Sequence, residues 1–138
     1  MSATEQAIEL ARVAARAAAD KKGTDILGLD VSENLALTDI FLIISAGNER
    51  QVAAVVDAVD EAVRGAGGKA VRREGERENR WVLLDYSDII VHVQQPEVRQ
   101  TYSLERLWKD CAEVDLQLPD AVPDVSVPDG AVSDGAGE

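Results

Sequence analysis

Apolar residues recur along this chain with two different spacings, one typical of helices and one typical of strands. The clearest helical spacing, with intervals of three and four residues, is a stripe of five valines: Val52, Val55, Val56, Val59 and Val63. Such spacing places all five side chains on one side of a helix. Residues 40–44 are instead apolar without a break, which indicates a strand buried on both faces. The chain therefore alternates between helix-forming and strand-forming segments.

Capping residues set the expected starts of the first two helices. Ser2 and Glu5 have the spacing of a capping box, which predicts a helix that begins here and ends at Gly23. Asn48 and Gln51 have the same spacing directly before the valine stripe. The stripe is therefore expected to lie on a second helix.

Strands are expected over residues 26–31, 40–45 and 69–74, and over two segments within 80–94 that a tight turn joins. Pro96 suits the first turn of a last helix, whose apolar face is Leu104, Leu107, Trp108 and Cys111. The order of elements is then α-β-β-α-β-β-β-α. The first two strands are too close in sequence for a helical crossover, whereas a helix separates the second from the third. We therefore expect an α/β fold with a mixed sheet of about five strands packed with helices.

The strand that begins at Trp81 belongs to a region rich in aromatic residues. Both tryptophans and both tyrosines of the chain lie between residues 81 and 108. Because side chains alternate along a strand, Trp81, Leu83 and Asp85 should share one face of the sheet and Tyr86 the other. One face must meet the helices. The other is either core or an exposed apolar patch of the kind that binds a protein, and the pattern favours neither.

The charge of the chain narrows the class of partner. A net charge of −12 over 138 residues argues against non-specific binding to nucleic acid, which needs Lys and Arg to neutralise phosphates, and suits a basic protein partner. Residues 119–138 combine acidic residues with Pro, Gly, Ala and Val, which predicts a disordered acidic tail after one domain over residues 1–118.

No apolar run has the length of a membrane span and no signal peptide is recognisable, so a cytoplasmic location is expected. Cys111, the single cysteine, cannot form an internal disulfide and is expected to be a buried, inert thiol.

Few side chains suggest catalysis or metal binding. His92 is the only histidine, and neither a second histidine nor a cysteine cluster accompanies it, so no zinc site is expected. The turn at Gly47 joins a strand to a helix and could hold an anion, but no Asp-x-Asp pair for magnesium follows it, so a helix cap is favoured. Asp39 could form an acid pair with Asp85 or Asp88, although an aspartate before a strand more often anchors a turn. We expect no catalytic residue, metal or cofactor.

Three motifs resemble those of one family. The first is Leu37-Thr38-Asp39-Ile40-Phe41, and the second is Ser-Ala-Gly-Asn-Glu-Arg-Gln-Val over residues 45–52. The third has the pattern W-x-L-x-D-Y-x-D followed by V-H-V over residues 81–93, and continues as R-x-x-Y-x-L-E-x-L-W over residues 99–108. In these motifs, and over nearly the whole chain before the tail, the sequence is similar to the ribosomal silencing factors, the Iojap-like family. Glu49 in place of serine and Ile40 in place of an aromatic residue are small departures.

This resemblance implies a nucleotidyltransferase-like fold and a translation factor that is not an enzyme. Such factors bind the large ribosomal subunit through the universal large-subunit protein fourteen, with little direct RNA contact. They sterically block joining of the small subunit, which slows translation when nutrients are scarce, and they are often homodimers when free. Organellar relatives assist large-subunit assembly, which is the alternative function. A nucleotidyltransferase-like enzyme that uses the Gly47 turn is a further alternative.

The resemblance also implies which residues bind the partner. In the family the strand that carries the tryptophan and its neighbourhood supply the contact. On this chain they correspond to Trp81, Leu83, Asp85, Tyr86, Ser87 and Tyr102. Trp81 would be the apolar anchor and Asp85 the partner of a lysine or arginine.

Overall fold

The computed structural model describes residues 2–118. Within them the elements are α1 (Glu5–Asp20), β1 (Thr24–Asp30), β2 (Ile40–Ser45), α2 (Glu49–Gly65), β3 (Arg72–Glu74), β4 (Trp81–Asp85), β5 (Ile89–Gln94), α3 (Pro96–Tyr102) and α4 (Leu104–Leu107). The observed order follows the expected one as far as β5, after which two short helices replace the single predicted one. The predicted acidic tail, residues 119–138, lies outside the described residues.

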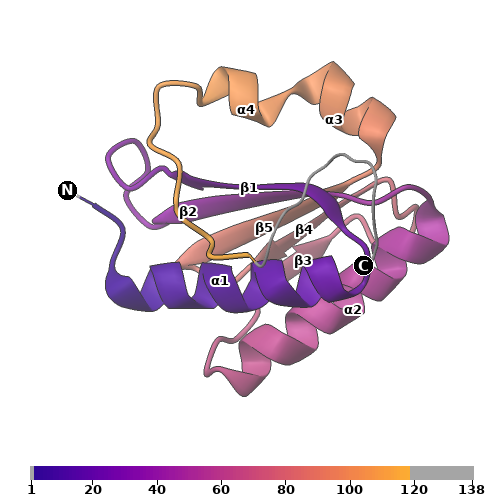
Figure 1. The fold of residues 1–138 in the computed structure, drawn as a ribbon, viewed down its shortest axis with the longest axis horizontal. Coiled ribbons are helices and arrows are strands. Elements are labelled where there is room, and N and C mark those ends of the chain that lie inside the picture. Colours follow the sequence, from indigo (N-terminus) through magenta and orange to yellow (C-terminus); the bar gives the residue numbers. More distant parts are fainter. Residues whose placement is uncertain (1, 119–138) are drawn as a thin grey trace, which may run out of the picture.

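The five strands form one mixed sheet in the order β1-β2-β5-β4-β3 (Figure 1). β2 and β5 are parallel neighbours, and the other three pairs are antiparallel. The predicted α/β class and mixed five-stranded sheet are thus confirmed. β3 is shorter than the predicted 69–74, because only Arg72–Glu74 pair with β4 in the sheet.

One face of the sheet is covered by α1 and α2 (Figure 1). The valine stripe of α2 is fully buried there, as its spacing predicts. The buried side of α1 is mostly alanine, and such small side chains let a helix pack close to its neighbours. β2, near the middle of the sheet, is buried over its whole length, which confirms the expectation from its continuous apolar run.

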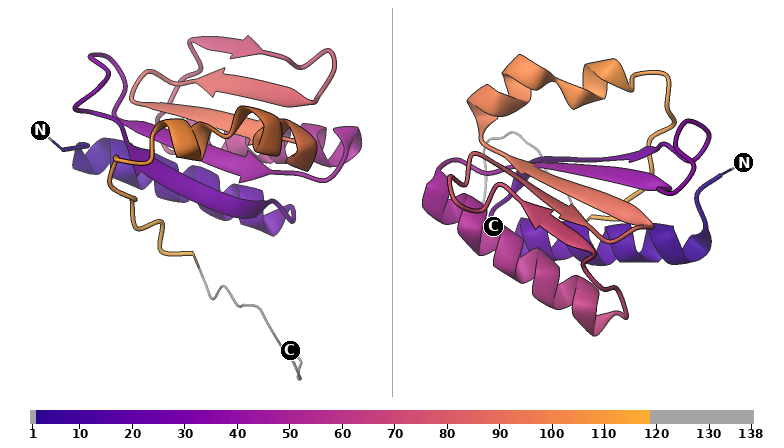
Figure 2. Two further views of the ribbon diagram at one scale, coloured as in Figure 1. Left: turned by 90° about the horizontal axis from the view of Figure 1, so that it is seen from above. Right: turned by 180° about the vertical axis from the view of Figure 1, so that it is seen from behind.

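The opposite face carries α3 and α4, which lie across β1, β2 and β5 (Figure 2). Ser103 separates the two helices in the left-handed conformation, with φ 32°, and α4 ends at Leu107. Leu104, Trp108 and Cys111 pack against the second apolar cluster, but Leu107 is 72% exposed. The predicted four-residue helical face is therefore wrong: Leu107 is exposed, and α4 ends before Trp108 and Cys111, which reach the cluster from the segment that follows the helix.

The start of α1 differs from the prediction. Thr4, not Ser2, is the N-cap, and its hydroxyl oxygen accepts a hydrogen bond from the backbone N–H of Ala7 at 3.1 Å. Distant carboxylates fix this start, because Asp30 accepts from the N–H of Ala3 and Asp39 accepts from the N–H of Thr4. Sequence spacing could not reveal these long-range contacts.

The predicted cap of α2 is confirmed. The side chain of Asn48 accepts from the N–H of Gln51 at 2.9 Å, and the side chain of Gln51 accepts from the N–H of Gly47 at 2.6 Å.

Replacing Asn48 with alanine leaves the backbone N–H of Gln51, in the first turn of α2, without its partner. We expect Asn48→Ala to lower the free energy of unfolding by about 1 kcal/mol in urea titrations. Asn48→Asp, which keeps the acceptor, should unfold close to wild type, and equal losses in both variants would contradict the capping role.

The chain after α4 returns along the outer edge of β1. The N–H of Asp30 donates to the carbonyl of Ala112, and the N–H of Val114 donates to the carbonyl of Gly28, both at 2.8 Å. Leu116 is buried in the core on the α1 side, and the carbonyl of Asp115 accepts from the side chain of Arg12. Part of this edge of the sheet is therefore covered by the protein's own chain.

Candidate protein-binding face

The two faces of β4 differ in burial. Val82 and Leu84 are fully buried under α1 and α2. Trp81, Leu83 and Asp85 alternate with them and are only half-buried. α3 and α4 lie over β1, β2 and β5 and leave much of β4 and β3 uncovered on that side (Figure 2). The sequence pattern left open whether this side is core or exposed, and the structure shows a partly exposed strand face.

An aromatic pair occupies this uncovered area. The rings of Trp81 and Tyr102 have their centroids 5.2 Å apart at an interplanar angle of 42°. Tyr102, at the end of α3, is 59% exposed. The indole N–H of Trp81 donates to Nδ1 of His92 at 3.1 Å. Two large aromatic side chains are thus held next to each other with part of their surfaces available to a partner. We call Trp81, Leu83, Asp85 and Tyr102 the Trp81 face.

A cavity of about 370 Å³ lies beside the indole, lined by Glu74, Gly75, Trp81 and Leu83. Gly75 follows β3 with φ 92°, a left-handed conformation that favours glycine. A Cβ atom at this position would overlap the carbonyl oxygen of Trp81. Glycine therefore lets the turn after β3 approach β4 closely, which shapes one wall of this cavity.

Asp85 and Ser87 lie together at the end of β4. One carboxylate oxygen of Asp85 accepts from the backbone N–H of Ser87 at 2.9 Å, and the other is 3.8 Å from the guanidinium of Arg72. Ser87 is exposed and has φ 70° in the turn to β5. A surface ion pair as long as this one contributes little energy, so the carboxylate can turn to a basic group on a partner.

Tyr86 does not belong to the Trp81 face. It points to the opposite side of the sheet and is only 4% exposed, with its hydroxyl donating to the carboxylate of Asp60 at 2.7 Å. Arg64 and Arg73 also pair with this buried carboxylate. Burial, together with the adjacent Asp60, raises the pKa of the Tyr86 phenol. The candidate set drawn from the family motif mixed residues from both sides of one strand, and strand alternation separates Tyr86 from the others.

Tyr86→Phe separates a structural role from a binding role. The variant removes one hydrogen bond to a buried carboxylate that keeps two arginine partners. We expect the free energy of unfolding to fall by about 1–1.5 kcal/mol in urea titrations. Binding to any partner of the Trp81 face should be unchanged, and a folded variant with clearly weaker binding would contradict this assignment.

The other chemical candidates have structural partners. The carboxylate of Asp39 accepts from the N–H of Thr4, and that of Asp85 accepts from the N–H of Ser87, so each anchors a local backbone turn or helix start. The Gly47 turn directs its N–H to Gln51, which supports a helix cap. Within residues 2–118 no three His, Cys, Asp or Glu side chains gather as metal ligands, and no helix is long and apolar enough to cross a membrane.

Cys111 is half-buried rather than buried as predicted. It packs against the second apolar cluster, on the side of the sheet that carries α3 and α4. Partial burial and the neighbouring carboxylates of Asp30, Asp110 and Glu33 raise the pKa of the Cys111 thiol. A raised pKa leaves less thiolate at neutral pH, which fits the expected unreactive thiol.

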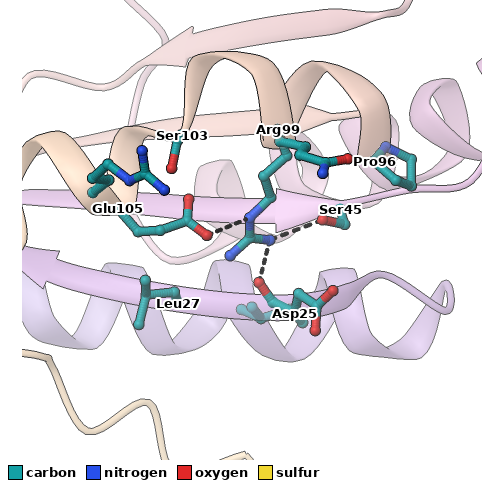
Figure 3. A pocket seen from close by; sticks show the side chains of 10 residues that line it. Asp25, Leu27, Ser45, Pro96, Arg99, Ser103 and Glu105 are labelled. Carbon is teal, nitrogen blue, oxygen red and sulfur yellow. Dashed lines mark hydrogen bonds and ion pairs between the residues drawn. The ribbon is translucent and has the colours of Figure 1, made fainter.

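A buried arginine joins α3, α4 and the sheet (Figure 3). Nε of Arg99 lies 3.3 Å from the carboxylate of Glu105, and Nη1 donates to the Ser45 hydroxyl at 2.9 Å and to the carbonyl of Asp25. These residues line a cavity of about 580 Å³. Arg99 and Glu105 lie on either side of Tyr102 in the sequence, so their pairing helps to hold Tyr102 over β4. Both residues belong to the third family motif, but the motif alone indicates no role for either of them.

The family model described as "Ribosomal silencing factor during starvation" matches residues 4–133. The chain belongs to the ribosomal silencing factor family. It is 35% identical to the ribosomal silencing factor of Halalkalibacterium halodurans, over 79% of this chain and 93% of that protein. A crystal structure of a protein from Chromobacterium violaceum has 37% identity and a TM-score of 0.71, covering 73% of this chain and 84% of that one. Membership in the ribosomal silencing factor family makes this protein a ribosome-associated regulator of translation.

A more distant relative has a different name. The "Mitochondrial assembly of ribosomal large subunit protein 1" of Mus musculus is 30% identical over 61% of this chain and 38% of that protein. This chain is therefore also similar in sequence to a protein named for large-subunit assembly.

Proposed function

We propose that this protein represses translation by binding the large ribosomal subunit through the universal large-subunit protein fourteen and blocking the approach of the small subunit. The observation that carries the proposal is the uncovered aromatic pair of Trp81 and Tyr102, on a chain whose net charge is −12. Large aromatic side chains with one exposed side are typical anchors of protein interfaces. A net negative charge complements a basic ribosomal protein and disfavours direct contact with RNA.

The proposed mechanism is steric and needs no catalytic group. The Trp81 face supplies the contact, with Trp81 as the apolar anchor, Asp85 as the partner of a lysine or arginine, and Ser87 at the rim. The rest of the domain then occupies space that the small subunit would fill. On this proposal the protein is not an enzyme, requires no cofactor, and acts in the cytoplasm when nutrients are limiting.

Co-sedimentation with purified ribosomal subunits tests the proposal. The protein should sediment with large subunits and not with small ones. Added before the small subunit, it should reduce formation of joined ribosomes, and a large excess of purified protein fourteen should compete it off. Absence of binding to large subunits, or binding that leaves subunit joining unchanged, would contradict the proposal.

The alternative function is assistance in large-subunit assembly, which the name of the mitochondrial relative favours. Both functions use the same docking surface, so binding experiments do not separate them. Ribosome profiles of cells that lack the protein do. Large-subunit precursors in growing cells would favour assembly, whereas normal subunits with excess translation in starved cells would favour repression.

We also propose that the free protein forms homodimers through the Trp81 face. An uncovered aromatic face is a common site of self-association when its partner is absent. Sedimentation equilibrium should give a dimer for wild type and a monomer for Trp81→Ala. A wild-type monomer, or a dimer that the substitution leaves intact, would contradict a dimer through this face.

A further inference from the structure

His92 occupies the middle of the sheet on the side of the Trp81 face. It lies opposite Leu83 of β4 and beside Ile43 of β2 in the strand register. The ring of Phe41 meets the imidazole edge to face, with centroids 5.0 Å apart at 72°. Only 5% of His92 is exposed. Its neighbours therefore fix the imidazole, and it has little freedom to change rotamer.

The hydrogen bond with Trp81 defines the chemical state of this imidazole. The indole N–H can only donate, so Nδ1 of His92 must be the acceptor at the observed 3.1 Å. The proton of the neutral ring then lies on Nε2, which is buried and has no hydrogen-bond partner among the described residues. Among the described residues, this fixed, neutral acceptor is the only hydrogen-bond partner of the Trp81 indole.

We propose that His92 is a positioning residue that holds the Trp81 indole in its binding-ready orientation. The inference rests on the proposed function, since it concerns how the same face binds the large subunit. The hydrogen bond fixes the polar edge of the indole, and the tilted ring of Tyr102 packs against it. The partner then meets a side chain that is already ordered.

Preorganisation of this kind has a measurable consequence. A side chain that is mobile before binding must be ordered on binding, and this lowers affinity. If His92 is replaced by a residue of similar size without an acceptor, the indole keeps its apolar contacts but loses its fixed orientation. We expect affinity for the large subunit to fall by about 3- to 10-fold in such a variant, on the usual cost of immobilising one large side chain.

His92→Leu and His92→Asn form the matched pair of variants. Leucine removes the acceptor, whereas the asparagine side-chain oxygen can occupy the position of Nδ1. The first readout is the indole N–H resonance and its hydrogen exchange in the full-length protein, at a concentration where sedimentation equilibrium gives a monomer, so that a dimer interface does not shield the indole. Trp108 serves as the internal control, because none of the described residues accepts a hydrogen bond from its indole. The second readout is co-sedimentation with large subunits.

In wild type, the indole N–H of Trp81 should exchange more slowly than that of Trp108. This difference should disappear in His92→Leu and return in His92→Asn. Affinity for the large subunit should likewise fall in His92→Leu and recover in His92→Asn. Equal exchange at the two indoles in wild type would overturn the proposal even if no variant folds. Equal weakening by leucine and asparagine, with both proteins folded, would also overturn it, because His92 would then contribute only packing. If wild type does not bind large subunits, the proposed function fails, and the exchange measurements alone decide whether His92 orients Trp81.

Discussion

Trp81→Ala is expected to weaken binding to the large ribosomal subunit by about 2 kcal/mol or more, roughly 30-fold in Kd, if Trp81 is the anchor of the interface. The substitution removes the largest side chain of the Trp81 face and leaves Tyr102 without the ring against which it packs. It also enlarges the cavity beside Leu83. Titration of labelled protein with large subunits, followed by co-sedimentation, measures the change.

Two controls make this result interpretable. Thermal unfolding followed by circular dichroism checks that the variant remains folded, since the half-buried indole also contributes to stability. Arg16→Ala changes an exposed residue of α1, on the opposite layer of the molecule, and should bind large subunits with an affinity close to that of wild type. A folded Trp81→Ala protein with unchanged affinity would remove Trp81 from the interface.

Acid is expected to destabilise the protein through His92. Burial lowers the pKa of His92 to about 4, below its ordinary value of 6.5. The unfolded chain therefore takes up a proton between these two pH values while the native imidazole does not. The contribution of the neutral imidazole to the free energy of unfolding is fully present above pH 6.5 and is lost as pH falls towards 4. The shift corresponds to about 3 kcal/mol in total, of which about 2 kcal/mol is lost by pH 5.

Urea unfolding of wild type and His92→Leu at pH 7.5 and at pH 5 isolates this contribution. Carboxylates contribute the same pH dependence to both proteins. In Asp30, for example, desolvation by burial raises the pKa, but hydrogen bonds from the Ser32 hydroxyl and the backbone N–H of Ala3 outweigh it and lower the pKa. Measurement at pH 5 avoids the sequence pI of about 4.4, where low net charge promotes association. The free energy of unfolding should fall between pH 7.5 and pH 5 by about 2 kcal/mol more in wild type than in His92→Leu. Equal pH dependence in both proteins would show that the native imidazole is protonated as readily as the unfolded one.

The sequence was sufficient where a feature depends on local periodicity. The valine stripe predicted α2, and the unbroken apolar run predicted the buried β2. Alternation along β4 predicted which residues share a face with Trp81, and it also contradicts the inclusion of Tyr86 in a single contact surface. These patterns succeed because one strand or one helix determines them.

The features that the sequence did not reveal depend on contacts between distant segments. His92 accepts from Trp81 only because the register of β4 and β5 places Leu83 opposite His92. Arg99 binds the carbonyl of Asp25, which is 74 positions away in the chain. The cap at Thr4 likewise depends on carboxylates from other elements. No local spacing encodes such pairs, so the supports of the Trp81 face became visible only in the folded chain.

The segment that returns along β1 determines where the chain can be cut or fused. A protein that ended at Cys111 would expose the N–H of Asp30 and the carbonyl of Gly28 at the sheet edge, and would remove Leu116 from the core. An open edge of this kind invites pairing with another chain and aggregation. Deletions of the acidic tail should therefore begin after Leu118. An affinity tag is best joined beyond this residue, on the side of the molecule away from the tryptophan–tyrosine pair.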